Sequence, residues 1–273
     1  MDARSILVLL AERFGAEAAL QHAAIAAQAL PDAAITALHV RVDPLTTIIP
    51  TEEVMPEGTE RAMLREAAEE GATIRVIFDA WAGQRPRGLP ASWEDLVGTE
   101  EDQIKQHAAS AALLVMAAPA AKTRGHALLA FHTALFDVQK PLLAVPVTHR
   151  AARVARILVG WKDSDVSRRA IEAAAPWLRR AETVEVVRVG EADQGELAAA
   201  EQLLADIGVR ATARAVAQDG LSNGRRLLAE AASMNADWLV MGAYRHNRFV
   251  ESLVGGVTRT VLREARLPLF LLH

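Results

Sequence analysis

Glycines and basic residues gather in one stretch that follows an apolar run and precedes a helix-forming segment. Gly242 follows the apolar run 236–241, and Gly255 and Gly256 stand thirteen and fourteen residues later, where the next helix is expected to begin. Glycine lets the backbone approach a phosphate closely, and the free amides at a helix start hold negative charge. The same glycines also suit the turn without any phosphate. The candidate anion-binding residues are Met241, Gly242, Arg245, Arg248, Gly255, Gly256, Val257 and Thr258.

A second group of candidates follows the apolar run 157–159. This group comprises Gly160, Trp161, Lys162 and Asp163. Trp161 could flank a bound base, or it could pack at a domain interface. Ser164 or Asp165 is expected to cap the next helix. We expect both groups at the carboxyl edge of a parallel sheet, which is the edge where such sheets bind ligands.

The elements that position these residues occur twice along the chain. The run 111–118 aligns without gaps to 236–243, with five identities in eight positions. Two further pairs follow the same order along the chain: 4–8 with 155–159, and 140–145 with 267–272. Such self-similarity indicates a duplication. We therefore predict two domains, 1–150 and 151–273.

Each half alternates apolar runs with helix-forming segments. This alternation predicts an α/β fold, with two repeated doubly wound parallel-sheet domains that are Rossmann-like. A single sheet shared by the whole chain would argue against two units. Strands are expected near 5–11, 33–42, 72–80, 111–117 and 141–147, and again near 154–160, 183–189, 208–217, 236–242 and 267–272.

The first half is longer than the second. Met116 lies 110 residues after Ile6, whereas the matching Met241 lies 84 residues after Ile157. Pro and Gly in 43–58 and 83–93 predict irregular loops at the carboxyl ends of the second and third strands. These loops could cover a site or reflect ordinary loop growth. The short polar join 148–153 predicts that the two domains pack together.

Several chemistries lack the residues that they need. The chain has no Cys, its eight His show no paired metal spacing, and no hydrolase elbow or P-loop lysine is present. We expect no catalytic residue and no metal. A net charge of −4 with scattered Arg and Trp argues against nucleic acid and anionic membrane as partners. The short apolar run 6–11 is no signal peptide, so we expect a cytoplasmic protein.

The stretch 241–260 and the order of elements around it resemble the universal stress protein family. Nucleotide-binding members carry Gly-x2-Gly-x9-Gly-Ser/Thr after the fourth strand, and the resemblance covers both halves. Gly242 and Gly255 match the first and third glycines of this pattern. Arg245 occupies the place of the second glycine, and Gly256 replaces the Ser or Thr. Basic side chains could substitute for the missing backbone contacts.

The resemblance implies a stress-response protein that binds ATP or another adenine nucleotide in its second half. The two halves would form an intramolecular pair, and a further homodimer stays open. The first half, with Ala117 and Ala120 at the glycine positions, is expected to hold no nucleotide. Lys162 stands where the family usually has a nucleoside-contacting Asp. We expect no enzyme, or at most a slow ATPase, and the alternative is an interaction module that binds no nucleotide.

Overall fold

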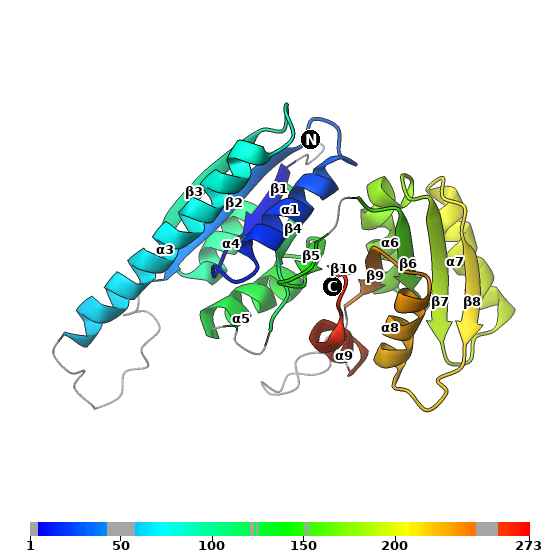
Figure 1. Ribbon diagram of the computed structural model, residues 1–273. Helices are drawn as coiled ribbons and strands as arrows, with labels where there is room; N and C mark the ends of the chain where they lie inside the picture. Colours follow the sequence, from blue (N-terminus) through cyan, green and yellow to red (C-terminus); the bar gives the residue numbers. More distant parts are fainter. Residues whose placement is uncertain (1–4, 43–57, 121–122, 124, 151–152, 244–255) are drawn as a thin grey trace.

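Strands and helices alternate along the chain, as the sequence predicts. The computed structural model describes residues 5–42, 58–120, 123, 125–150, 153–243 and 256–273 (Figure 1). The first half holds β1 (Ser5–Leu9), α1 (Ala16–Ala27), β2 (Ala34–Val42), α3 (Thr59–Gln84), β3 (Ala91–Gly98), α4 (Glu100–Ala108), β4 (Ala111–Ala117), α5 (Gly125–His132), η1 (Thr133–Asp137) and β5 (Leu142–Val145). The second holds β6 (Arg156–Gly160), α6 (Asp165–Leu178), β7 (Thr183–Val189), α7 (Gln194–Asp206), β8 (Thr212–Val216), α8 (Asn223–Ser233), β9 (Trp238–Gly242), α9 (Gly256–Glu264) and β10 (Leu269–Leu272).

The strands form one ten-stranded sheet in the order β3-β2-β1-β4-β5-β10-β9-β6-β7-β8. Counted within its own half, each set of five strands has the same order, 3-2-1-4-5, and all pairs within a half are parallel. The fold is therefore two repeated doubly wound units. Our expectation that a shared sheet would argue against two units was wrong, because two separate sheets can join through their edge strands.

The two halves meet where β5 and β10 pair, and Figure 1 shows these strands between them. This pair is antiparallel, with Leu143 opposite Phe270, whereas every other pair in the sheet is parallel. An antiparallel pair is the arrangement that a local two-fold axis between like edge strands produces. This pairing gives hydrogen-bond partners to the backbone of one edge strand in each half-sheet. Neither of these two strands is therefore an exposed sheet edge.

Alternate strand residues pack under helices on opposite faces of the sheet. Ile6 and Val8 belong to a core that includes residues of α1, α3, α6 and α7. Leu7 and Leu9 belong to a second core with residues of α4, α5, η1, α8 and α9. Because both faces of each strand are buried, the strands read as continuous apolar runs rather than as alternating ones.

The third strand of the first half lies elsewhere than predicted. Residues 72–80 fall within the helix α3, and the strand is β3. Ile74, Phe78 and Trp81 recur at helical spacing and are buried on one face of α3, so the apolar residues mark a helix. Consequently the predicted loop 83–93 shrinks to the turn between α3 and β3, which lies at the amino end of β3 and away from the ligand edge. Most of the other predicted loop, 43–58, lies outside the described residues.

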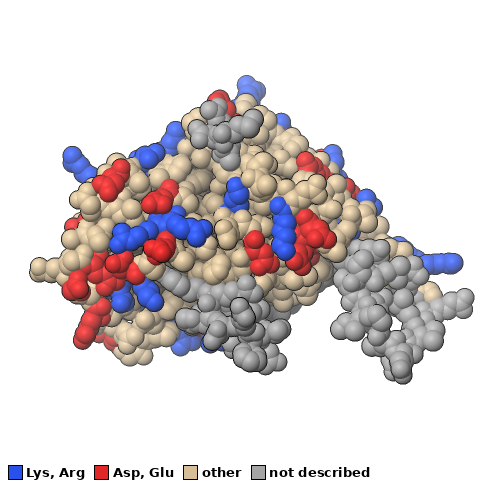
Figure 2. All heavy atoms as spheres, turned by 180° about the vertical axis from the view of Figure 1, so that it is seen from behind, with Lys and Arg blue, Asp and Glu red and all other residues tan. Residues whose placement is uncertain are grey.

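No helix among the described residues is long and apolar enough to cross a membrane. On the face drawn in Figure 2, basic side chains lie among acidic ones. Charged side chains of the described residues form ion pairs, such as Arg75 with Asp79 and Lys105 with Glu101. The described surface on this side thus matches the mixed charge of the composition.

A histidine pair ties the join between the halves to α1. The Nδ1 atom of the buried His22 lies 2.8 Å from the carbonyl oxygen of Ala18, and its Nε2 lies 3.0 Å from Nδ1 of His149. Since a carbonyl only accepts, His22 donates through Nδ1, and its Nε2 accepts from His149. Burial lowers the pKa of His22 to about 4.

The His22 pKa predicts a loss of stability in acid. The unfolded chain takes up the proton near pH 6.5, so the stabilisation is present above that pH and is lost as the pH falls towards 4. The change is on the order of 3 kcal/mol. Urea denaturation between pH 7 and pH 4 should show a smaller acid loss for His22→Leu than for the wild type. If the free energy of unfolding fell equally with pH in the two proteins, the acid loss could not be assigned to His22.

Candidate functional site

The two predicted groups of site residues come together at the carboxyl ends of β6 and β9. These strands are parallel neighbours, with Gly160 in register with Met241. From β6 the chain continues to β7 on one side, whereas β9 lies on the other side. The gap between β6 and β9 is therefore the switch point of the second half, the place where open α/β sheets bind ligands.

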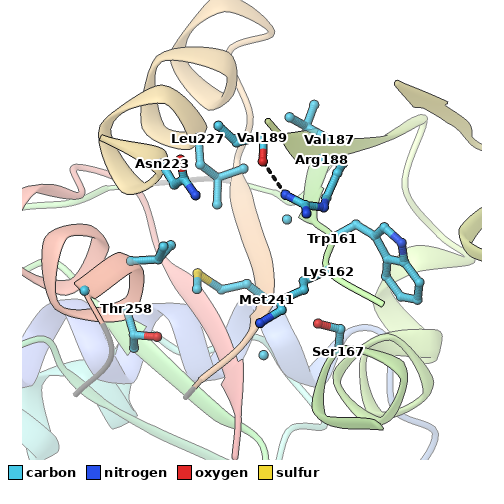
Figure 3. Close-up of a pocket in the computed structure, with 14 residues that line it drawn as sticks. Trp161, Lys162, Ser167, Val187, Arg188, Val189, Asn223, Leu227, Met241 and Thr258 are labelled. Carbon is cyan, nitrogen blue, oxygen red and sulfur yellow. Dashed lines mark hydrogen bonds between the residues drawn. The ribbon is translucent and has the colours of Figure 1, made fainter. Parts of the chain in front are cut away.

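A pocket of about 300 Å³ opens at this switch point (Figure 3). Of the twelve predicted residues, eight line it: Gly160, Trp161, Lys162, Met241, Gly242, Gly256, Val257 and Thr258. Arg245, Arg248 and Gly255 lie outside the described residues. Asp163 is not among the described residues that line the pocket, and its role in nucleotide binding stays a prediction. Its carboxylate faces Arg168 instead, with Oδ1 2.5 Å from Nη2.

Two of the pocket glycines are required by packing. A Cβ on Gly160 would stand 2.7 Å from Cδ2 of Leu227, and one on Gly242 would stand 2.9 Å from Cγ1 of Val166. Gly256 differs, because no atom of the described residues lies within 4 Å of the place of its Cβ. The first two glycines therefore let α8 and α6 pack close to the strands. The third leaves open space at the first residue of α9.

The start of α9 supplies the polar end of the pocket. Gly256, Val257 and Thr258 all line it, and Thr258 is buried. The first amides of a helix have no intrahelical acceptor, and the helix dipole places partial positive charge there. Figure 3 shows the Lys162 side chain extending into the pocket on the side of Ser167. This end of the pocket suits an anionic group.

The remaining walls are largely apolar. Trp161, Val187, Leu227 and Met241 contribute them. Trp161 is buried and its backbone amide donates to the carbonyl of Val187 at 2.9 Å. Its indole ring packs in the core that includes residues of α6 and α7, and Figure 3 shows the ring directed away from Leu227 and Met241. An apolar cavity with a few polar groups is typical of small-molecule sites.

Sequence reasoning missed six residues that line the pocket. They are Ser167, Val187, Arg188, Val189, Asn223 and Leu227. Three of them end β7, the second strand of this half, and two begin α8. Strand ends carry no motif of their own. The order of strands in the sheet could have indicated them, because the carboxyl ends of all parallel strands meet at one edge.

Arg188 is held in the pocket wall by two hydrogen bonds. Its Nε lies 2.8 Å from Oε1 of Glu196, and its Nη1 donates to the carbonyl of Val189. The same Glu196 oxygen accepts the backbone amide of Asp163 at 3.3 Å. None of the described lining residues is acidic, and the described part of the chain holds no cluster of three metal-ligating side chains.

The corresponding edge of the first half is nearly filled. The cavity there measures about 20 Å³ and is lined by residues that include Leu10, Phe14, Met116 and Ala117. A Cβ on Gly15 would stand only 2.6 Å from the methyl group of Ala117, which shows how tightly the chain packs where the second half has Gly242. Only the second of these two equivalent places offers room for a ligand of nucleotide size.

Comparison with known proteins finds a family model that matches the second half of the chain. Residues 154–273 match the model of the Universal stress protein family. A universal stress protein from Archaeoglobus fulgidus DSM 4304 is similar at 18% identity and a TM-score of 0.70, over 99% of this chain and 96% of that chain. A candidate universal stress protein from Pseudomonas aeruginosa UCBPP-PA14 is similar at 14% identity and a TM-score of 0.57, over 99% and 93%.

No curated protein sequence matches the chain. At these identities the similar structures establish the fold, and the family model establishes the kinship of the second half. Both agree with a fold of two repeated units. Residues 154–273 therefore form a domain of the universal stress protein family, and the chain has the fold of universal stress proteins over its full length.

Proposed function

We propose that the second half binds a purine nucleotide in the pocket between β6 and β9. The observation that carries this proposal is that, among the described residues, the start of α9 lines one end of the pocket and apolar side chains line the walls across from it. A phosphate would lie at the start of α9, near Lys162 and Thr258. The base would lie beside Leu227 and Val187, toward the end of β7. ATP and other adenine nucleotides, which the family resemblance implies, are the first ligands to test.

The proposed role is binding in a stress response rather than catalysis. Phosphoryl transfer needs a metal-holding carboxylate and a group that positions water. The described lining residues provide no carboxylate. We therefore propose at most a slow ATPase, in a cytoplasmic protein whose two halves, 1–150 and 151–273, form an intramolecular pair.

Thermal unfolding with added nucleotide tests the proposal. A ligand that binds only the native state adds about 2.7 kcal/mol at a hundred times its Kd. We expect Tm to rise by several degrees with a purine nucleotide. Lys162→Glu should weaken binding by roughly tenfold or more, because it places an anion beside the phosphate. Lys162 is exposed, so this change should leave the fold intact.

Arg169→Glu is the matched control. Arg169 is an exposed residue of α6 that does not line the pocket, and its replacement makes the same change of charge. It should leave nucleotide binding within about twofold, since surface charges act weakly through solvent. The absence of any Tm shift with ATP, ADP, AMP, GTP or IMP would refute the proposal. That result would favour the alternative, an interaction module that binds no nucleotide.

A further inference from the structure

Arg188 lies at the end of the pocket opposite the start of α9. Figure 3 shows Thr258 at one end and Arg188 with Val189 at the other. A nucleotide with its phosphate at α9 would therefore direct its base toward Arg188. The Arg188 side chain is 24% exposed, so most of it is enclosed by the protein.

The hydrogen bonds of Arg188 fix its orientation and leave donors for a ligand. Guanidinium has five N–H groups, and the bonds to Glu196 and to the carbonyl of Val189 use two of them. The remaining donors belong to Nη1 and Nη2. Because Glu196 balances the charge of Arg188, these donors suit a neutral acceptor in a base as well as an anion.

Hydrogen-bond acceptors at this end of the pocket are already engaged. The carbonyl of Val187 accepts the amide of Trp161, and the carbonyl of Val189 accepts from Arg188. The side-chain oxygen of Asn223 accepts from Gln218, and Figure 3 shows its amide nitrogen on the side of the pocket. The wall that would face the base is thus rich in donors.

We propose that Arg188 makes the pocket selective for 6-oxopurine nucleotides, those of hypoxanthine and guanine, over adenine nucleotides. Hypoxanthine and guanine present two adjacent acceptors, O6 and N7, which match the donor pair of an arginine. Adenine presents N7 beside an amino group, so a donor would face a donor and the amino group would be left without an acceptor. This inference rests on the proposed nucleotide binding and adds the choice of base to it.

The matched ligands for the test are IMP and AMP, which share their ribose and phosphate and differ in the group at C6. Isothermal titration of the full-length protein should give a Kd for IMP about tenfold or more below that for AMP, and GMP should follow IMP. In Arg188→Met, which keeps the length of the side chain without its donors, the ratio of the two Kd values should fall to about one. The ratio is a useful readout because a general loss of stability affects both ligands alike.

Two further variants guard against a folding defect. Arg188→Lys keeps a charge for Glu196 but lacks the planar pair of donors, so it should bind both nucleotides with the preference for IMP reduced at least severalfold. Arg169→Met, on the exposed side of α6, should keep the wild-type ratio. Equal or tighter binding of AMP by the wild type would overturn the inference while nucleotide binding itself stands. An unchanged ratio in Arg188→Met would overturn it as well.

Discussion

Replacing Glu100 by glutamine is expected to remove a contribution to stability that the wild-type protein loses as the pH rises from about 5 to about 8. Glu100 is the first residue of α4 and only 4% exposed. Among the described residues, neither of its carboxylate oxygens has a hydrogen-bond partner. Burial, together with the nearby charge of Glu12, raises the pKa of Glu100 to about 8. The folded protein therefore keeps this carboxyl group neutral at a pH where the unfolded chain has already ionised it.

The direction follows from the difference in bound protons. Between the ordinary pKa of 4.5 and the raised one, the folded state binds more protons than the unfolded state, so the free energy of unfolding decreases as pH rises. The stabilisation is complete below pH 4.5 and is lost by the time the pH exceeds about 8. The total is on the order of 4 kcal/mol, and coupling to Glu12 makes it a property of the pair.

Urea denaturation at pH 5, 7 and 9 measures the effect. Glu100→Gln cannot ionise, so it should keep nearly the same stability from pH 7 to pH 9 and should exceed the wild type at pH 9, while the acid effect of His22 is common to both proteins at pH 5. Glu101→Gln is the matched control, because Glu101 is the next residue and forms an exposed pair with Lys105. Glu101→Gln should lower the free energy of unfolding by less than about 1 kcal/mol and should leave its dependence on pH unchanged. A slope that persists in Glu100→Gln would show that another group causes it.

The sequence alone predicted the repeat and the carboxyl edge, because both depend on patterns that are local in the chain. Apolar runs followed by glycine mark the ends of β6 and β9, and eight of the predicted residues line the pocket. Residues 72–80, which belong to the helix α3, were predicted to form a strand. A short apolar segment such as the one near Ile74 fits both the helical and the strand periodicity. Arg188 was missed because its role depends on β7 lying beside β6, which is a matter of tertiary order.

The sequence alone also does not predict which charged residues are buried. Glu100 looks like an ordinary helix-start carboxylate, which usually lies in solvent and favours the helix dipole. Its enclosure follows from how the helices of the first half close over an edge that the second half leaves open as a pocket. The two equivalent edges have thus diverged. The buried Glu12 lines the cavity of about 20 Å³ at the first edge, whereas Lys162 and Arg188 line the cavity of about 300 Å³ at the second.

Truncating Trp177 is expected to weaken the contact between the two halves. Trp177 of α6 is 4% exposed, and its Nε1 donates to the carbonyl of Ala26 in α1 at 3.0 Å, so one side chain joins the halves. Its ring also lies 5.4 Å from that of Phe270 and 5.9 Å from that of Trp238. Trp177→Ala leaves a large cavity at this contact and should cost about 3–5 kcal/mol in the free energy of unfolding.

Hydrogen exchange distinguishes this role from a general loss of packing. If Trp177 holds the halves together, the amides of β5 and β10 should exchange faster in Trp177→Ala, because this strand pair joins the two half-sheets. Trp177→Phe keeps an aromatic ring and loses only the bond to Ala26, so it should cost roughly 1–2 kcal/mol and leave most of that protection. Trp81→Ala, which truncates a ring packed on Phe78 within the first half, should destabilise the protein without selectively exposing β10. Equal protection of β5 and β10 in the wild type and Trp177→Ala would mean that the strand pairing alone fixes the two halves.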